Sequence, residues 1–470
     1  MKFISLLLAF GSVAVAVVAE PQRPRVLKIN FRRGLVRDGG PPGLRKRDGT
    51  VNSTLQNRIG LYTIDIGIGN PPQPISALID TGSSDALINT NVSQLCEQSS
   101  RPCAPSGTYN ANASSTSQYV NSLFNISYVD GSGAAGDFVS DDVRVSGQQV
   151  RGVQIGVAYK SSSPQSVLGI GLSSNEAQAA RGGRGDSSRR EYVNFPAKMA
   201  DDGVIASNSY SLYLNDINAP DGSVLFGGVD SDRYEPPLVA MPMQKVDGKF
   251  SEFFITMTSL SLNNETLADN LSLAVLLDSG STFSYLPDKV AQSIYSAVNA
   301  RFNDQSGAAF VPCSLSSSSA SLRFNFSSPA SVSVPLRELV IDPTSLSGRP
   351  VNFGDGVPAC YLGIMPSGGS SGSSANVLGD TFLRSAYVVY DLQGKTIALA
   401  NTRYNVTASN VQEIPADGKI PDAVDARDPI RATTGLPGQR SGGAPVGAAG
   451  HSPFAAVVLA LVVSVMIGYA

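Results

Sequence analysis

The chain carries two short stretches in which an aspartate has the same surroundings. Residues 78–84 read Leu-Ile-Asp-Thr-Gly-Ser-Ser, and residues 276–282 read Leu-Leu-Asp-Ser-Gly-Ser-Thr. In each, two apolar residues precede the acid, which is typical of a buried strand, and a glycine then permits a tight turn. This order predicts that Asp80 and Asp278 each end a buried strand, with hydroxyl and backbone N–H groups nearby to orient the carboxylate.

Two carboxyl groups in one site can catalyse hydrolysis by water. One carboxylate accepts a proton from the attacking water, while the other group, protonated, polarises the carbonyl that is attacked. Two such groups close together cannot both ionise easily, so the pair has one low and one raised apparent pKa. A single strand ending in Asp-Thr-Gly is more often only a turn. The second copy favours two similar halves, each supplying one acid to a shared site.

The only histidine of the chain is His451, which comes just before the apolar C-terminal tail in the sequence. The rest of the chain therefore has no imidazole. Ser-His-Asp and Cys-His hydrolases need an imidazole as the base, and the common zinc sites need one as a ligand. Carboxylate, tyrosine and lysine side chains remain for acid–base chemistry. The sequence thus predicts neither a metal site nor a cofactor.

The two motifs, Asp-Thr-Gly-Ser and Asp-Ser-Gly-Ser after apolar residues, resemble the paired active-site motifs of the pepsin-like aspartic proteases, and the resemblance covers roughly residues 55–405. It implies an all-β, bilobal fold with pseudo-twofold related lobes and a cleft between them. It also implies that Asp80 and Asp278 hold the lytic water between them. The supporting residues would be Thr81 and Ser279, which bond across the lobe interface, Ser83 and Ser281, which bond the outer carboxylate oxygens, and Gly82 and Gly280.

A β-hairpin is predicted around a glycine-rich turn. Alternating segments, residues 123–128 and 136–139, flank the sequence Val-Asp-Gly-Ser-Gly. The hairpin resembles the family's flap, which closes over bound peptide, and Tyr128 has the position of the flap tyrosine. The substrate-binding residues would be Tyr128, Asp130, Gly131 and Ser132, and Asp130 would favour basic residues in the substrate.

The chain departs from the family pattern in having no tryptophan. Many members follow the first motif with Asp-Leu-Trp, and that indole bonds the flap tyrosine. Here residues 85–88 read Asp-Ala-Leu-Ile, so the resemblance leaves Tyr128 without this partner.

Other segments also follow the family's order. The alternating residues 61–69 predict a strand that Asn-Pro-Pro-Gln-Pro then turns into the strand carrying Asp80. Residues 166–171 and 376–380 form a second internal repeat. In the family such strands pack beside the catalytic loops, one in each lobe. A twofold architecture explains both repeats.

The four cysteines form no C-x-x-C pair, which argues against a zinc ribbon or redox dithiol. An even number in a secreted chain indicates disulfides, although spacing alone does not give the pairing. The family resemblance favours Cys96–Cys103 and Cys313–Cys360, one in each lobe.

Length and composition predict two lobes with tails. A chain of 470 residues is too long for a single hydrophobic core, and its 42% hydrophobic content is sufficient for globular folding. Residues 1–47 hold ten Lys or Arg and two acidic residues, a net charge of +8. Because the whole chain carries −3, residues 48–470 carry −11. An acidic body behind a basic leader argues against nucleic acid as a partner.

The N-terminal sequence predicts a signal peptide followed by a propeptide. Residues 1–19, basic and then apolar, predict a signal peptide cleaved after Ala19. Residues 20–47 end in Arg-Lys-Arg and predict a propeptide that inhibits the protein's own cleft. Within it, residues 26–29 would lie over the cleft, with Lys28 facing the two acids.

After residue 405 the strand pattern stops. Residues 406–443 are rich in Pro, Gly and Ala and predict a flexible stalk. Residues 444–470 end in an apolar tail with no basic residue behind it, which matches a GPI-attachment signal better than a membrane span, with Gly442 or Gly443 as the anchor site.

Two features concern the surface. The polar insertion 173–192 contains Arg189-Arg190, which is either a solvated pair or a nicking site. Eight N-glycosylation sequons fit a secreted protein, at Asn52, Asn91, Asn112, Asn125, Asn264, Asn270, Asn325 and Asn405.

Together these features predict a monomeric, GPI-anchored aspartic endopeptidase of fungal yapsin-like type, which cleaves peptide or protein substrates at acidic pH. Its N-terminal lobe would span residues 48–240 and its C-terminal lobe residues 241–405. It would reach the cell surface through the secretory pathway, anchored in the plasma membrane or transferred from there to the cell wall. The rivals are a non-catalytic wall or binding protein on the same fold and a two-carboxylate glycosidase, which has no need of duplicated motifs.

Overall fold

The computed structural model describes residues 25–33, 62–128, 132–180, 191–219, 221–347, 349–368 and 375–437. Several predicted features lie outside these residues: the signal peptide, most of the propeptide, Asn52, Asp130, Gly131, the Arg189-Arg190 pair, Gly442, Gly443 and the apolar tail. Within them strands predominate and the helices are short, the longest being α3 with 11 residues. The predicted all-β, bilobal fold is confirmed.

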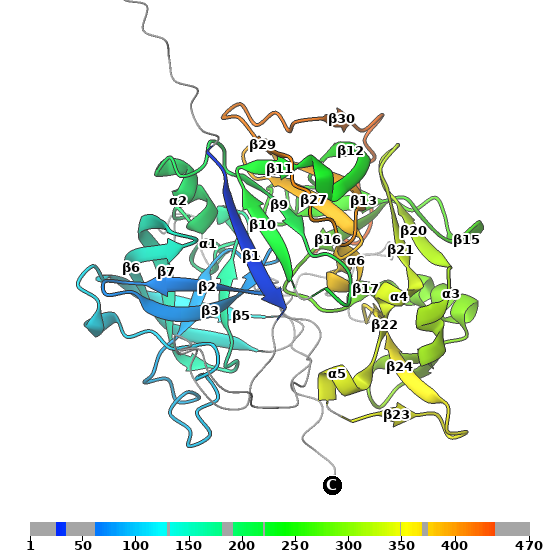
Figure 1. Cartoon of the computed structure of the whole chain (residues 1–470), viewed down its shortest axis with the longest axis horizontal. Coiled ribbons are helices and arrows are strands. Elements are labelled where there is room, and N and C mark those ends of the chain that lie inside the picture. The colour runs from blue at the N-terminus through cyan, green and yellow to red at the C-terminus, as the bar shows by residue number, and fades with distance from the viewer. Residues whose placement is uncertain are drawn as a thin grey trace, which may run out of the picture.

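The N-terminal lobe is a set of seven consecutive strands at the left of Figure 1. In β2 every second side chain is buried, as the alternating sequence predicts. The strands are β2 (Tyr62–Ile68), β3 (Gln73–Asp80), β4 (Ala86–Asn89), β5 (Gln118–Ser127), β6 (Gly133–Val145), β7 (Gln148–Ser161) and β8 (Ser166–Gly169).

These strands continue into a 14-stranded sheet whose other strands lie between the lobes, in the order β30-β12-β28-β27-β9-β10-β1-β2-β3-β8-β4-β7-β6-β5. The added strands are β1 (Leu27–Arg33), β9 (Ser209–Tyr213), β10 (Asp221–Phe226), β12 (Tyr234–Pro242), β27 (Ala386–Asp391), β28 (Thr396–Thr402) and β30 (Ala423–Asp425). A separate pair is formed by β11 (Gly228–Asp230) and β29 (Val411–Glu413).

The C-terminal lobe contains three smaller sheets, at the right of Figure 1. The first holds β13 (Phe254–Met257), β16 (Leu273–Leu277), β26 (Val377–Leu378), β17 (Ser284–Leu286) and β25 (Ile364–Pro366). The second holds β15 (Glu265–Ala268), β14 (Ser259–Leu262), β20 (Ser321–Asn325) and β21 (Ser331–Pro335). The third holds β18 (Arg301–Asn303), β19 (Ala308–Pro312), β24 (Pro358–Leu362), β22 (Val340–Ile341) and β23 (Val351–Asn352).

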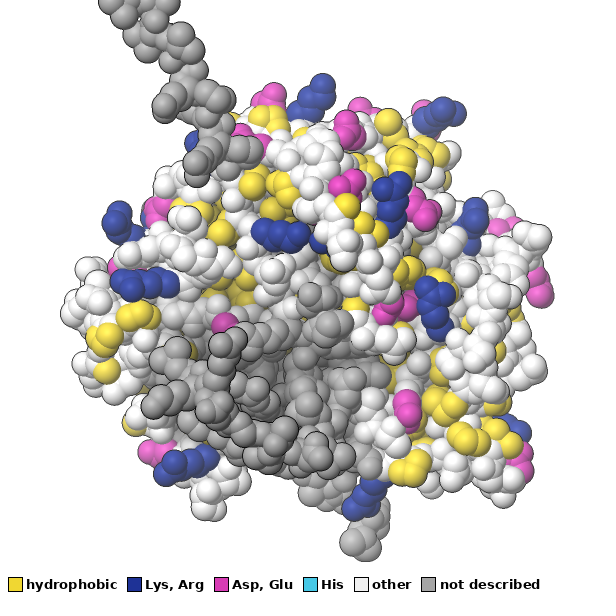
Figure 2. All heavy atoms as spheres, viewed as in Figure 1, with side chains coloured by type: hydrophobic (Ala, Val, Ile, Leu, Met, Phe, Trp, Pro, Cys, Tyr) yellow, Lys and Arg dark blue, Asp and Glu magenta, His cyan; other side chains and the backbone are white. Residues whose placement is uncertain are grey.

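The helices connect these strands. They are α1 (Ala177–Ala180), α2 (Phe195–Asp201), α3 (Asp288–Val298), α4 (Leu336–Leu339), α5 (Pro343–Ser347) and α6 (Asp380–Leu383). Short 3₁₀ turns occur at η1 (Ala111–Ala113), η2 (Ser173–Asn175), η3 (Ser231–Arg233) and η4 (Cys313–Ser317). Charged side chains are sparse on the face shown in Figure 2, where Lys and Arg are spread singly among uncharged and acidic groups.

The strand pairing repeats around the two aspartate motifs. In the N-terminal lobe β3 pairs with β8 in parallel and β8 pairs with β4 antiparallel. In the C-terminal lobe β16 pairs with β26 in parallel and β26 pairs with β17 antiparallel. The second internal repeat therefore supplies the strand beside each aspartate-bearing strand, as predicted.

Strand β1, from the predicted propeptide, is built into the central sheet. It pairs with β10 along residues 27–32 and with β2 at its end. Leu27, Ile29 and Phe31 are buried in the main core, and the Phe31 ring packs edge-on against Tyr62.

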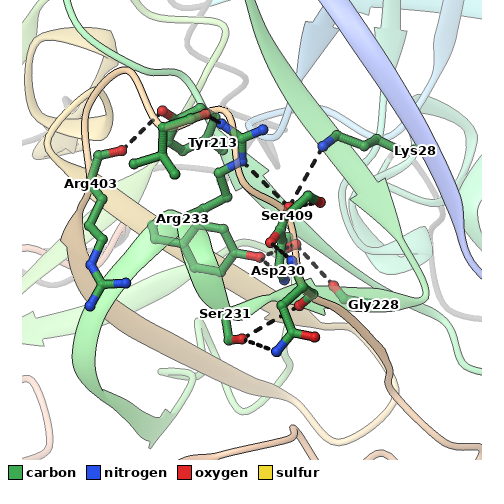
Figure 3. Close-up of polar contacts among 12 residues, drawn as sticks. Lys28, Tyr213, Gly228, Asp230, Ser231, Arg233, Arg403 and Ser409 are labelled. Atoms are coloured by element: carbon green, nitrogen blue, oxygen red, sulfur yellow. Dashed lines mark hydrogen bonds and ion pairs between the residues drawn. The ribbon is translucent and has the colours of Figure 1, made fainter.

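The position of Lys28 differs from the prediction that it faces the two acids. Its ammonium lies 3.6 Å from Asp230 Oδ2, at the end of β11. Figure 3 shows Lys28, Arg233 and Ser409 converging on this carboxylate, with Ser409 Oγ donating at 2.6 Å. Because alternate side chains of a strand point to opposite faces, the burial of Leu27 and Ile29 turns Lys28 away from the core.

The segment after residue 405 also differs from the prediction of a flexible stalk, at least as far as residue 437. Strand β29 pairs with β11 and β30 pairs with β12. Ile414 is fully buried, and Thr434 accepts a backbone hydrogen bond from Ala274 in β16. Residues 406–437 are therefore packed against both lobes through β11, β12 and β16.

Both predicted disulfides are present. Cys96–Cys103 closes a small loop in the N-terminal lobe, and Cys313–Cys360 joins η4 to β24 in the C-terminal lobe. No cysteine is free.

Candidate active site

The two motif aspartates lie at equivalent ends of two buried strands. Asp80 is the last residue of β3, where Ile170 donates to its carbonyl at 2.9 Å. Asp278 follows β16 directly and donates its backbone N–H to Leu378 at 3.2 Å. Both side chains are fully buried. The apolar residues before each acid hold the strand in the core and so fix where its carboxyl group lies.

The same pair of donors orients each carboxyl group. Asp80 Oδ1 accepts from the Gly82 N–H at 2.8 Å, and its Oδ2 accepts from the Ser83 hydroxyl. In the other lobe Asp278 Oδ1 accepts from the Gly280 N–H at 2.8 Å, and its Oδ2 accepts from Ser281 Oγ at 2.7 Å. The turn after each acid therefore supplies two donors that prevent the carboxyl group from rotating.

Thr81 and Ser279 exchange hydrogen bonds across the lobe interface. Thr81 Oγ1 donates to the Leu277 carbonyl at 2.9 Å and accepts from the Ser279 N–H at 2.9 Å. Ser279 Oγ donates to the Ile79 carbonyl at 2.9 Å and accepts from the Thr81 N–H at 3.2 Å. These four reciprocal bonds join the two turns into one rigid unit.

The glycines allow the two acids to meet. A side chain at Gly82 would place its Cβ 2.5 Å from Asp278 Oδ1, and one at Gly280 would collide with the Asp80 carboxyl group. With hydrogen in these places the two carboxyl groups lie side by side, since a Cβ at Gly280 would overlap Asp80 Oδ1 and lie 3.1 Å from Asp278 Oδ1.

Burial and mutual repulsion set the protonation of this pair. Burial, and next the charge of Asp80, raise the pKa of Asp278 well above its usual value. Burial also raises the pKa of Asp80, although the hydrogen bond from Ser83 opposes the rise. Two acids this close hold one proton between them over a wide range of pH, so one is charged and the other neutral. Such a pair can accept one proton and donate another.

The predicted flap is a hairpin of β5 and β6. Its last strand pair is Ser127 with Gly133, and beyond it the Tyr128 N–H donates to the Ser132 carbonyl at 2.8 Å. Tyr128 is buried in an apolar cluster that also contains Leu78 of β3 and Leu87 of β4. Tyr128 therefore packs near the strand that carries Asp80, and Leu87 lies in the place where the family resemblance predicts an indole.

Sequence reasoning missed a polar group next to the first motif. Asp85 is buried and accepts hydrogen bonds from the Tyr192 hydroxyl at 2.8 Å and from the Ala177 N–H at 2.7 Å. Glu176 accepts from the Tyr192 N–H at 2.7 Å. Burial, followed by the nearby charge of Asp85, raises the pKa of Glu176 to about 10. No sequence pattern connects Asp85 with Tyr192, which is 107 positions later.

Two further observations concern the described residues alone. Among them, no three His, Cys, Asp or Glu side chains converge in a way that could hold a metal ion. None of the helices built from these residues is long and apolar enough to cross a bilayer.

A sequence model of the family described as eukaryotic aspartyl protease matches residues 61–402. The chain belongs to this family. The match spans both lobes and both aspartate motifs, so the predicted aspartic-type endopeptidase is confirmed at the level of the family.

Individual aspartyl proteases resemble the chain over most of its length. It is 44% identical over 393 residues to the probable aspartic-type endopeptidase opsB of Aspergillus oryzae, covering 82% of this chain and 78% of that one. It is 36% identical over 412 residues to secreted aspartic protease 1 of Candida albicans, covering 85% and 96%. The crystal structure of the aspartic proteinase from Irpex lacteus superposes with a TM-score of 0.60 at 19% identity, over 82% of this chain and all of that one, which bears on the fold alone.

Proposed function

We propose that this aspartyl protease is a secreted, cell-surface endopeptidase that hydrolyses peptide bonds at acidic pH, with Asp80 and Asp278 as its catalytic pair. The observation that carries the proposal is the close approach of two buried carboxyl groups, one from each lobe, each held by an equivalent glycine N–H and serine hydroxyl.

In the mechanism, a water molecule lies between the two carboxyl groups. The ionised carboxylate removes a proton from this water as it attacks the peptide carbonyl carbon, and the protonated partner donates a hydrogen bond to the carbonyl oxygen. The tetrahedral intermediate then collapses, and the leaving nitrogen receives a proton from the pair. Ser83 and Ser281 keep the carboxyl planes fixed, so little reorganisation is needed during reaction. Tyr128 closes over the substrate and excludes bulk water.

The pair must hold a single proton for this chemistry. As pH rises and the second carboxyl group ionises, no group remains to polarise the peptide carbonyl, so activity is lost. The raised pKa of Asp278 extends the working range upward from the usual value of a carboxyl group. The proposal therefore gives an acidic optimum with a limb that falls toward neutral pH.

The remaining parts of the proposal concern processing and location. Residues 1–19 are removed as a signal peptide, residues 20–47 are removed after Arg47 as an inhibitory propeptide, and the tail is exchanged for a GPI anchor at Gly442 or Gly443. The anchor would leave a monomeric enzyme of yapsin-like type on the plasma membrane or wall. The relative named a secreted aspartic protease supports secretion.

The test is cleavage of casein and of a randomised peptide library by propeptide-free protein at acidic pH, with and without pepstatin. The proposal predicts pepstatin-sensitive cleavage, with basic residues preferred through Asp130. Correctly processed protein with no pepstatin-sensitive activity would favour the non-catalytic alternative, and purely hydrophobic cleavage sites would refute the role of Asp130.

A further inference from the structure

An aromatic path leads from the first aspartate motif to the flap. Asp85, five residues after Asp80, accepts the Tyr192 hydroxyl at 2.8 Å. The Tyr192 ring packs edge-on against Phe138 of β6, with centroids 5.6 Å apart. Phe138 in turn packs against Phe124 of β5 at 5.2 Å. The two phenylalanines are therefore on the two strands of the flap hairpin.

This path belongs to an apolar cluster separate from the main core. The cluster contains Tyr128 at the flap, Leu78 before Asp80, and Leu87, and Tyr192 packs against its edge. Phe124 covers the backbone of Gly156, where a Cβ would overlap its ring. Because protein interiors are close-packed, a shift of the Tyr192 ring is transmitted to Phe138 and so to the hairpin.

Tyr192 is itself fixed at three points. Its hydroxyl donates to Asp85, its backbone N–H donates to Glu176 at 2.7 Å, and its ring lies against Phe138. Asp85 also accepts the Ala177 N–H at the start of α1. The tyrosine thus ties the turn that carries the first acid to the base of the hairpin that covers the cleft.

We propose that Tyr192 is a positioning residue, which holds the flap in the orientation that accepts substrate by connecting it to the Asp80 turn through Asp85. The chain has no tryptophan, and the cluster against which Tyr192 packs contains both Tyr128 and Leu87. The inference rests on the proposed catalytic function, because a correct flap position matters only to a protein that binds peptide in the cleft.

Losing the hydrogen bond between Tyr192 and Asp85 should weaken the binding of substrate and inhibitor. If the flap spends only a fraction of its time in the accepting orientation, the apparent affinity for any ligand that needs it falls by that fraction. Tyr192→Phe removes one hydrogen bond to the buried Asp85 carboxylate, and the loss of a hydrogen bond to such a group is enough to shift the orientation of the flap roughly tenfold. The Michaelis constant and the pepstatin inhibition constant then rise by the same factor, while kcat changes little.

The experiment compares Tyr192→Phe with Tyr159→Phe. Tyr159 also donates to an aspartate, Asp137, at 3.1 Å, but it is exposed on β7 outside the cluster. We expect Tyr192→Phe to raise both KM and the pepstatin Ki by roughly tenfold with kcat within about twofold, and Tyr159→Phe to leave all three near the wild type. A loss of kcat at unchanged KM, or constants within twofold of the wild type, overturns the proposal.

A second measurement does not depend on turnover. Because the chain lacks tryptophan, Leu123→Trp on β5 places its only tryptophan on the flap hairpin. Adding Tyr192→Phe should lower its fluorescence anisotropy, and adding Tyr159→Phe should not. An unchanged anisotropy with Tyr192→Phe refutes the tie to the flap even if the protein proves not to be a protease, whereas absence of wild-type activity with a lowered anisotropy refutes only the proposed function.

Discussion

The cross-lobe bonds of Thr81 give the most quantitative test of how the two lobes are held at the active site. Replacing Thr81 by valine keeps the shape of the side chain and removes its hydroxyl. The Leu277 carbonyl and the Ser279 N–H, each 2.9 Å from that hydroxyl, then lose a buried partner. An unsatisfied buried polar group costs about 1–3 kcal/mol, so two such groups cost roughly 2–6 kcal/mol of unfolding free energy.

For a folded body of this size the loss corresponds to a fall in apparent Tm of roughly 3–8 °C. The turns that carry the two acids also lose part of their connection, so kcat/KM should fall at least about tenfold in the protein that remains folded. Differential scanning calorimetry and peptide cleavage measure the two effects.

The matched control is Thr256→Val in β13. Thr256 is also buried, but its hydroxyl has no hydrogen-bond partner among the described residues. Removing it should leave Tm unchanged or slightly higher, because a buried hydroxyl without a partner opposes folding. Equal destabilisation by the two substitutions would refute the reasoning, since it would attribute the effect to the loss of any buried hydroxyl.

Three further predictions follow. Burial raises the pKa of Glu252 to about 8, so its contribution to stability is complete below about pH 4.5 and is lost as pH rises toward 8. Glu252→Gln should therefore flatten the fall of Tm between these pH values, whereas Glu265→Gln, at an exposed site, should not. Parallel profiles of Tm against pH for the two variants would refute this assignment. A chain that stops at residue 437 should keep its Tm and activity. A chain that stops at residue 405 loses β29, β30 and the buried Ile414 and should fail to accumulate as folded protein. Equal yields of folded protein from the two chains would contradict a structural role for residues 406–437. Asn325 should carry no glycan, because its side-chain nitrogen donates to Ser259 Oγ at 2.9 Å within β20, whereas the exposed Asn264 should be glycosylated, and peptide mapping by mass spectrometry after deglycosylation distinguishes them.

The sequence predicted the site well where short motifs carry their own geometry. Asp80 and Asp278 each stand between an apolar strand and a glycine turn, and the repeat of this pattern was sufficient to place them together. The all-β fold, the strands beside the two acids and both disulfides were also predicted.

The parts that the sequence did not predict depend on partners far along the chain. The sequence predicts that Lys28 lies over the cleft, facing the two acids. Its actual position depends on the pairing of β1 with β10 and β2, which brings Lys28 to Asp230. The composition of residues 406–437 is typical of a linker, yet their backbone groups find partners on β11, β12 and β16. Tyr192 is the last residue of the polar insertion 173–192, and its bond to Asp85 joins residues 107 positions apart that only the folded chain brings together.

The most direct measurement of the central claim is cleavage of a peptide substrate at acidic pH by propeptide-free Asp278→Asn protein. The asparagine oxygen can still accept the Gly280 N–H, so the variant should fold and its turns should stay in place. The account predicts that this folded variant shows no cleavage above the uncatalysed rate. Pepstatin-sensitive cleavage at more than about a hundredth of the wild-type rate would contradict it, because a single carboxyl group cannot supply both the base and the acid.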